Sequence, residues 1–140
     1  MPVSLTRTVG FRAVHRLYRA DWSPERNRET FGPLSEPPGH PHDYRCAVTV
    51  TGPLDPAMGM VTDLVELDRI LREEVVIPFE GRNLNQDVAE FASGATLPTC
   101  EALAALLYGR IAPRLPAGVS LARVRVAEDA TLHADCTGSP

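Results

Sequence analysis

Alternating apolar and polar residues predict strands in several segments of the chain. Residues 8–17 alternate with a period of two, which is typical of a half-buried strand. The apolar side of that segment consists of Val9, Phe11, Ala13, His15 and Leu17. Residues 42–51 and 120–128 alternate in the same way, and residues 130–136 are a candidate for a last strand.

Two further segments carry apolar residues at helical spacing. The first begins after Asp63, a favourable N-cap, and Pro78 is predicted to stop it. The second begins at Pro98-Thr99 and is predicted to end at Pro113. Residues 18–41 and 79–97 show little periodicity and are predicted to be mostly loop. A loop as long as the first is usually functional in a compact domain.

The order of these elements predicts an α+β fold. Strands joined by loops favour antiparallel pairing, and the two helices would cover one face of a small sheet. The chain has 140 residues, of which 44% are hydrophobic and 23% charged. These values predict one folded domain over residues 1–140 rather than a disordered chain.

Composition excludes several classes of function. The net charge of −4 argues against nucleic acid as a partner. All 14 basic residues are arginine, which excludes a Schiff-base or P-loop lysine. No apolar run approaches the roughly 18 residues of a membrane span, and residues 1–10 do not read as a signal peptide. Three widely spaced cysteines argue against a disulfide framework or a cysteine-based zinc cluster. We therefore expect a cytoplasmic protein with no membrane partner.

The histidines suggest a metal site. His40 and His42 are two residues apart, so on a strand they project from the same face about 6–7 Å apart. Antiparallel pairing could bring His15 alongside them. Three neutral imidazoles with one open position are typical of a catalytic Zn²⁺ site. Alternatively, His15 is a hydrogen-bonded core residue, and an H-x-H pair alone is a weak signal.

Acidic residues offer a second kind of site. Glu128 shares a strand face with Val124 and Val126. It either lies exposed beyond the strand end or accepts two N–H bonds from a planar amidine-like group, as in a pterin or guanine ring. Thr99 and Glu101 open the second helix, where the pattern by itself favours capping, with Thr as N-cap and Glu in the first turn.

A series of motifs then resembles a known family. The motifs are F-R-A-V-H-R-L at Phe11–Leu17, F-G at Phe31-Gly32, G-H-P-H-D-Y at Gly39–Tyr44, D-P-A-M-G-M-V-T-D-L at Asp55–Leu64, N-L-N at Asn83–Asn85, P-T-C-E at Pro98–Glu101 and V-R-V-A-E at Val124–Glu128. In this order they resemble the 6-pyruvoyltetrahydropterin synthase family, which includes the 6-carboxytetrahydropterin synthases of the queuosine pathway.

The resemblance implies a tunnelling fold, in which a four-stranded antiparallel sheet carries two helices on one face. Such sheets join as trimers into a barrel, and two trimers stack as a hexamer with the active sites between subunits. It implies Zn²⁺ held by His15, His40 and His42. It also implies that Glu128 anchors a pterin ring, with Thr99 and Glu101 nearby.

The chain departs from the family at two positions. The family's catalytic cysteine follows the F-G pair, where this chain has Leu34, and an Asp-His pair precedes N-L-N, where it has Glu80 and Gly81. Glu36 is a candidate replacement base, because the cysteine of shorter-loop relatives also lies four residues before the first histidine of H-x-H. Some members that resemble this family carry Glu there and yield a 6-hydroxymethyl pterin. The simpler alternative for Glu36 is a solvated loop carboxylate, and Glu80 is a second candidate base.

Three functional hypotheses follow. The first is a zinc-dependent lyase acting on the side chain of a dihydropterin, with a glutamate base. The second is the same scaffold acting on a different substrate in a specialised biosynthetic pathway. The third is a pterin-binding protein without catalysis. In each case we expect a small pterin-like partner and a homo-oligomer, either a trimer or a hexamer.

Overall fold

Four antiparallel strands form one sheet in the order β1-β2-β3-β4. The structure is a computed structural model and describes residues 3–138. The strands are β1 (Val3–His15), β2 (His40–Gly52), β3 (Ser120–Asp129) and β4 (Leu132–Cys136). The predicted α+β sheet is therefore confirmed. β2 begins at His40 rather than at residue 42, so both histidines of the H-x-H pair lie on the strand.

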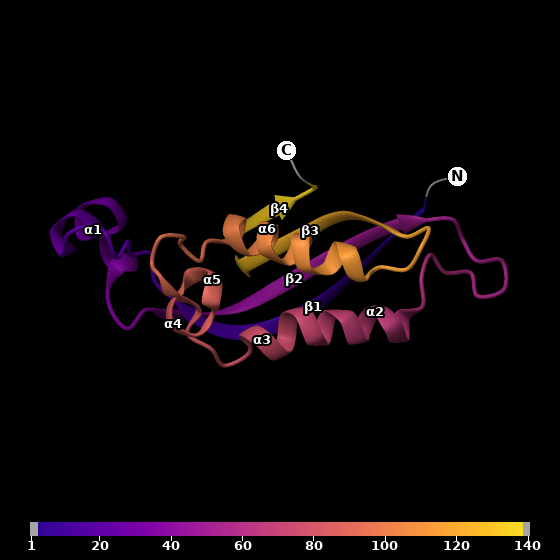
Figure 1. Cartoon of the computed structure of the whole chain (residues 1–140), viewed down its shortest axis with the longest axis horizontal. Coiled ribbons are helices and arrows are strands. Elements are labelled where there is room, and N and C mark those ends of the chain that lie inside the picture. The colour runs from indigo at the N-terminus through magenta and orange to yellow at the C-terminus, as the bar shows by residue number, and fades with distance from the viewer. Residues whose placement is uncertain (1–2, 139–140) are drawn as a thin grey trace.

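Two helical segments cover one face of this sheet (Figure 1). The first is α2 (Leu64–Leu71), which continues through a π-helical turn, η2 (Arg72–Val76), into the short α3 (Ile77–Phe79). The second is α6 (Cys100–Ile111), followed by the 3₁₀ turn η3 (Ala112–Arg114). The first segment ends just past Pro78, close to the predicted stop. Among residues 3–138, no helix has both the length and the apolar composition that crossing a membrane requires.

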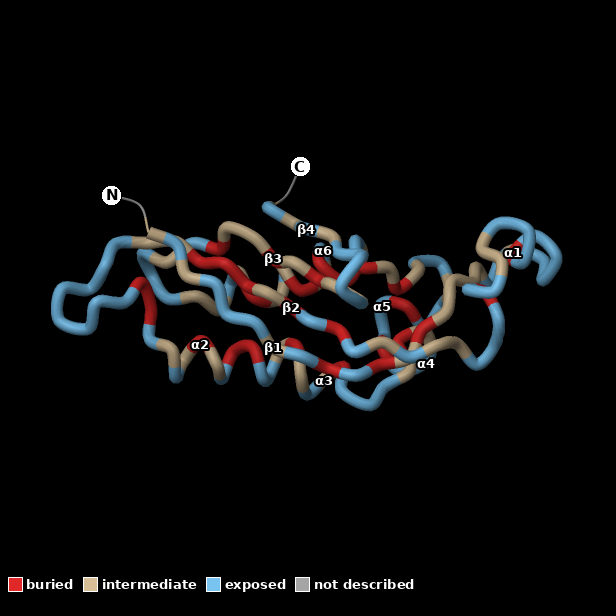
Figure 2. The backbone as a smooth tube through the Cα atoms, turned by 180° about the vertical axis from the view of Figure 1, so that it is seen from behind, coloured by how far each residue is buried: buried red, intermediate tan, exposed pale blue. Residues whose placement is uncertain are grey.

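The hydrophobic core lies between the sheet and these helices, as the burial colours in Figure 2 show along the strands and inner helix faces. Alternate strand positions face the helices, including Phe11 on β1, Val48 on β2 and Val126 on β3. Leu67 of α2 and Leu107 of α6 pack against them and are also buried. Burying each such side chain contributes about 1.5–3 kcal/mol to the stability of the fold. The arrangement that buries the apolar side of every strand and helix is therefore the one that the sequence pattern favours.

The predicted loop over residues 18–41 is wrong in part, because it contains a helix. This is α1 (Pro24–Phe31), followed by the 3₁₀ turn η1 (Gly32–Ser35). α1 projects from one end of the molecule (Figure 1), and its buried residue is the polar Asn27. Without an apolar stripe, hydrophobic periodicity cannot reveal a helix. The Ser23 cap and Pro24 at the first position were the available signals.

The prediction of loop over residues 79–97 is also wrong in part. Two single-turn helices, α4 (Leu84–Asp87) and α5 (Ala89–Ala92), interrupt it. The start of this segment lies along the outer edge of β1. Gly81 donates its N–H to the carbonyl of Arg12 at 2.8 Å, and Val14 donates to the carbonyl of Arg82 at 2.9 Å. These bonds hold the end of β1 that carries His15.

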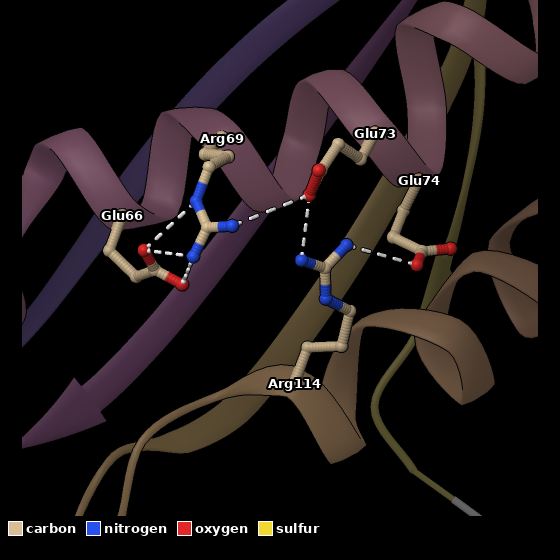
Figure 3. A network of polar contacts seen from close by, with 5 residues as sticks. All are labelled: Glu66, Arg69, Glu73, Glu74 and Arg114. Atoms are coloured by element: carbon tan, nitrogen blue, oxygen red, sulfur yellow. Dashed lines mark hydrogen bonds and ion pairs between the residues drawn. The ribbon is translucent and has the colours of Figure 1, made fainter.

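A network of ion pairs joins the two helical segments (Figure 3). Arg114 of η3 lies between two carboxylates of η2, with nitrogen–oxygen distances of 2.8 Å to Glu73 and 3.1 Å to Glu74. Arg69 of α2 pairs with Glu66 at 2.6 Å and extends the network along the helix. The π-helical turn therefore directs two consecutive glutamates toward one arginine.

Candidate metal and ligand site

Three histidines meet at the end of β1 and the start of β2. His15 and His40 are paired across the two strands, and His42 pairs with Ala13. All three rings lie on the helix-facing side, with ring centroids 4.7 Å apart for His15–His40 and 5.0 Å apart for the other two pairs. One ring nitrogen of each lies within 4.8 Å of the others. Strand pairing thus creates this juxtaposition of residues distant in sequence.

The ring of His15 is fixed by a backbone carbonyl. Its Nδ1 lies 2.8 Å from the carbonyl oxygen of Pro98. A carbonyl can only accept a hydrogen bond, so Nδ1 carries the proton and Nε2 keeps its lone pair. Such a bond to the outer ring nitrogen is usual in metal-binding histidines. Pro98 comes directly before α6, and sequence reasoning had no signal for this contact because it involves a main-chain atom.

Burial favours the neutral form of His15 and of His40. Burial is the main cause that lowers the pKa of His15, which is 2% exposed, and the neighbouring histidines lower it further. The pKa of His40 is also lowered, first by burial and then by His42. A neutral imidazole is the form that binds a metal ion.

The chemistry of the three side chains fits a metal ion. The Nε2 atom of His42 is buried and has no hydrogen-bond partner within residues 3–138. A buried nitrogen without a partner is costly, and a metal ion would satisfy its lone pair. Three imidazoles are a donor set that Zn²⁺ favours.

Glu128 lies directly beside the histidines. Its Oε2 is 3.0 Å from Nε2 of His42, although the pair is not aligned as a hydrogen bond. Its Oε1 accepts a hydrogen bond from the thiol of Cys100 at 3.4 Å. The side chain is 15% exposed, so it is neither fully solvated nor sealed in the core. This burial argues against the alternative in which Glu128 lies exposed beyond the strand end, and its contact with a ligand stays a prediction.

Asp129, a second acidic residue near the histidines, is hydrogen-bonded within the turn between β3 and β4. Asp129 lies with His42 and Glu128 in a cluster whose ligand atoms are also within 4.8 Å of one another. However, Oδ1 of Asp129 accepts three hydrogen bonds, from the N–H and hydroxyl of Thr131 and the N–H of Leu132. Asp129 therefore shapes the β3–β4 turn.

Thr99 and Glu101 occupy the first turn of α6, as capping predicts. The hydroxyl of Thr99 accepts a hydrogen bond from the N–H of Ala102 at 3.1 Å, which confirms Thr99 as the N-cap. Glu101 is exposed in the same turn, where a negative charge favours the helix dipole. Helix capping accounts for both residues, and their contact with a ligand stays a prediction.

Glu36 follows η1 on an exposed part of the chain. It lines a hollow of about 430 Å³ together with Arg16, Tyr18 and Arg28. Arg16 follows His15 directly and donates a hydrogen bond to the carbonyl of Ser35 at 3.1 Å. The segment that carries Glu36 is thus tied to the chain leaving the histidine cluster. Within the described part of the chain, no hydrogen bond or ion pair joins Glu36 to the histidines.

Glu80 has a structural partner at the edge of the sheet. Its Oε2 accepts a hydrogen bond from the backbone N–H of Arg12 at 2.7 Å. That N–H points away from β2, so the carboxylate satisfies an amide at the outer edge of β1. Between Val3 and Gly138, Glu80 makes no hydrogen bond or ion pair with a histidine. Its role as a base stays a prediction.

Two contributors to this site were not singled out from the sequence. Cys100 contacts Glu128, and Tyr44 is 1% exposed with a hydroxyl that has no hydrogen-bond partner in the range 3–138. Burial, and then the charge of Glu128, raise the pKa of Tyr44. The alternation of β2 put Tyr44 on the core face, but nothing in the sequence indicated a missing partner.

Comparison with known proteins gives a consistent result. The family model described as 6-pyruvoyl tetrahydropterin synthase matches residues 4–139. The human protein named 6-pyruvoyl tetrahydrobiopterin synthase is 39% identical over 124 residues, which cover 89% of this chain and 83% of the human one. A Drosophila melanogaster protein of the same name is 35% identical over 89% of this chain and 73% of its own.

Solved structures agree with the sequence relatives. The structure of Caenorhabditis elegans 6-pyruvoyl tetrahydropterin synthase matches with a TM-score of 0.90 and 30% identity, covering 99% of this chain and 97% of that chain. An uncharacterized protein from Wolinella succinogenes matches with a TM-score of 0.71 and 16% identity over 99% of both chains, which shows the fold alone. The chain therefore belongs to the 6-pyruvoyl tetrahydropterin synthase family.

Proposed function

We propose that this chain is a zinc-dependent lyase that acts on the side chain of a dihydropterin such as dihydroneopterin triphosphate. The observation that carries the proposal is the meeting of three histidines, one with an unpartnered buried nitrogen, directly beside the Glu128 carboxylate. Relatives named for pterin synthesis support the substrate class. We also assign the protein to the cytoplasm, which stays a prediction.

The proposed reaction gives three roles to residues of this chain, namely metal binding, ring binding and proton removal. His15, His40 and His42 would hold Zn²⁺, and the bond from His15 to Pro98 keeps a free nitrogen available to it. When bound, Zn²⁺ supplies a Lewis acid that polarises a ligand oxygen. The Glu128 carboxylate accepts hydrogen bonds from the N–H groups of the ring.

Glu36 is the proposed base that removes a side-chain proton, and Glu80 is the second candidate. Two hydrogen bonds support the role of Glu36 as the base. Arg16 donates to the carbonyl of Ser35, and the N–H of Leu17 donates to the carbonyl of Leu34 at 2.9 Å. Together they hold the loop that carries Glu36 beside the chain that leaves His15. Glu80 already accepts a backbone hydrogen bond. We therefore rank Glu36 first.

The test is turnover of dihydroneopterin triphosphate by zinc-loaded protein, with products identified by mass spectrometry. A positioned base contributes about 10²–10⁴-fold, so Glu36→Gln should lower kcat by that factor while zinc content stays unchanged. The matched variant Glu80→Gln should lower stability and retain turnover. The reverse result would move the base from Glu36 to Glu80.

Two outcomes would replace this proposal with an alternative. Tight pterin binding without conversion by zinc-loaded protein would indicate a binding protein. Neither binding nor conversion would indicate a different substrate on the same scaffold. Both alternatives are motivated by Leu34 and Gly81, which stand where the family has its catalytic cysteine and histidine.

We further propose that the chain works as a homo-oligomer, a trimer or two stacked trimers. Its support is the sheet face opposite α2 and α6, which no element within residues 3–138 covers in the view from behind (Figure 2). Light scattering on the purified protein should give three or six times the monomer mass. A monomer would contradict this assignment.

A further inference from the structure

Cys100 is the first residue of α6 and is 2% exposed. Its thiol donates a hydrogen bond to Oε1 of Glu128, with a sulfur–oxygen distance of 3.4 Å. Thr99 caps the same turn, so the start of the helix is fixed and the thiol is directed at β3. The contact therefore comes from a rigid element rather than from a loop.

The Glu128 carboxylate has few other partners. Its Oε2 lies beside His42, and no arginine pairs with it in the described chain. A carboxylate can accept about four hydrogen bonds, so capacity remains for a molecule that brings N–H groups. A partly buried carboxylate without a cation depends on the donors around it for both its energy and its orientation.

Tyr44 provides an independent sign that this group is arranged for a further molecule. Arg45 of β2 pairs with Ala127 of β3, so Tyr44 and Glu128 are the next residues outward on neighbouring strands. The hydroxyl of Tyr44 is buried and has no hydrogen-bond partner among residues 3–138. Leaving such a group unpaired costs about 1–3 kcal/mol. The group formed by Tyr44, Cys100 and Glu128 thus keeps unused hydrogen-bonding capacity.

The thiol is suited to donate rather than to react. Burial, and then the charge of Glu128, raise the pKa of Cys100 to about 12. The sulfur therefore keeps its proton at neutral pH and remains a donor to the carboxylate.

We infer that Cys100 is a positioning residue, whose thiol holds the Glu128 carboxylate in the orientation that accepts two N–H bonds from a pterin-type ring. The inference rests on the proposed function, because it takes Glu128 as the anchor of the ring. It adds a residue whose side-chain hydrogen bond, among residues 3–138, goes to Glu128 and not to a histidine of the cluster. Losing the thiol should weaken ring binding and leave the chemical step largely intact.

The experiment compares Cys100→Ala, Cys100→Val and Cys100→Ser with a matched control, Cys46→Ala. Cys46 is fully buried on the same side of the sheet and lies on β2. Equilibrium binding of neopterin by fluorescence and KM for dihydroneopterin triphosphate are measured, together with zinc content. Cys100→Ala and Cys100→Val should raise Kd and KM about 5- to 10-fold with kcat within about twofold, since a hydrogen bond to a charged group is lost.

Cys100→Ser keeps a donor and should bind the ring within about twofold of the natural chain. Cys100→Val fills the space of the thiol and leaves no cavity, so it remains informative if the alanine variant unfolds. Unchanged binding in a folded Cys100→Val variant would overturn the inference, as would equal weakening by Cys46→Ala.

Glu128→Gln separates the two proposals. If it leaves ring binding intact, the anchor role itself fails. If it weakens binding while Cys100→Val does not, only this inference fails.

Discussion

Gly39 shows how closely individual residues constrain the histidine cluster. Its φ of +115° is rare for residues with a side chain. A Cβ atom there would lie 2.6 Å from the carbonyl oxygen of His15 and 2.9 Å from its carbonyl carbon. Gly39→Ala should therefore lower the free energy of unfolding by about 1–3 kcal/mol and push His15 away from His40. Urea denaturation and zinc content of the purified variant measure the two effects.

Gly59→Ala is the matched control for Gly39→Ala. Gly59 also has a positive φ, +67°, but nothing lies within 4 Å of its added Cβ. It should cost about 1 kcal/mol from the backbone alone and leave the zinc content unchanged. If both variants retained the same amount of zinc, the close approach of Gly39 to His15 would not matter for the metal site.

At the scale of elements, the start of α6 connects several parts of the site. Thr99→Ala removes the hydrogen bond to the N–H of Ala102 and should cost about 1 kcal/mol of unfolding free energy. Thr99→Ser keeps the cap and should restore most of that loss. Chemical denaturation and ring binding are measured on both variants. A serine variant with full stability but weakened binding would show that Thr99 acts on the ligand beyond its role as a cap.

The junction between η2 and η3 gives a second prediction at this scale. Arg114 and Arg69 each pair with two glutamates (Figure 3). The Arg114 side chain is 29% exposed, whereas that of Arg69 is 60% exposed. Arg114→Ala should lower the urea midpoint more than Arg69→Ala does, because ion pairs that are less exposed to solvent contribute more than exposed ones. The difference should shrink in 1 M salt, where screening weakens ion pairs. Equal midpoints in low salt would contradict this view of the junction.

Elements with one buried face were predictable from the sequence, because burial forces a regular spacing. Val48 on β2 and Leu67 on α2 are members of such patterns. α1 was missed because it buries Asn27 rather than an apolar stripe, so no hydrophobic period marks it. The one-turn helices α4 and α5 were missed because segments that short carry no period.

In the candidate site, too, some features follow from regular spacing along the sequence and others do not. His15, His40 and His42 meet because strand phase and antiparallel pairing bring them together. The alternation predicted the phase, whereas the register that pairs His15 with His40 was only one possibility. The contact of Cys100 with Glu128 depends on how α6 is placed over β3, which spacing along one segment does not fix. The roles of loop residues such as Glu36 depend on the path of an irregular segment, for which the sequence offers no repeat.

At the scale of the whole molecule, a metal ion would tie the end of β1 to the start of β2. The chain between them, residues 16–39, contains α1 and departs furthest from the packed layers (Figure 1). An ion held by His15 and His40 would therefore join the two ends of this segment. Because the ion would bind the folded state alone, its removal should lower stability by an amount that depends on its concentration relative to Kd.

Removal of the metal by a chelator should lower Tm by several degrees. At free Zn²⁺ of 100 times Kd the loss is about 2.7 kcal/mol, and each kcal/mol moves Tm by roughly 2–8 °C in domains of comparable size. Adding Zn²⁺ back should restore Tm, whereas a His40→Ala variant should start low and respond to neither treatment. Hydrogen exchange should show the largest loss of protection in residues 16–39. A chelator effect of equal size in His40→Ala would place the stabilising ion elsewhere, and the proposed histidine site would then lose its role in the fold.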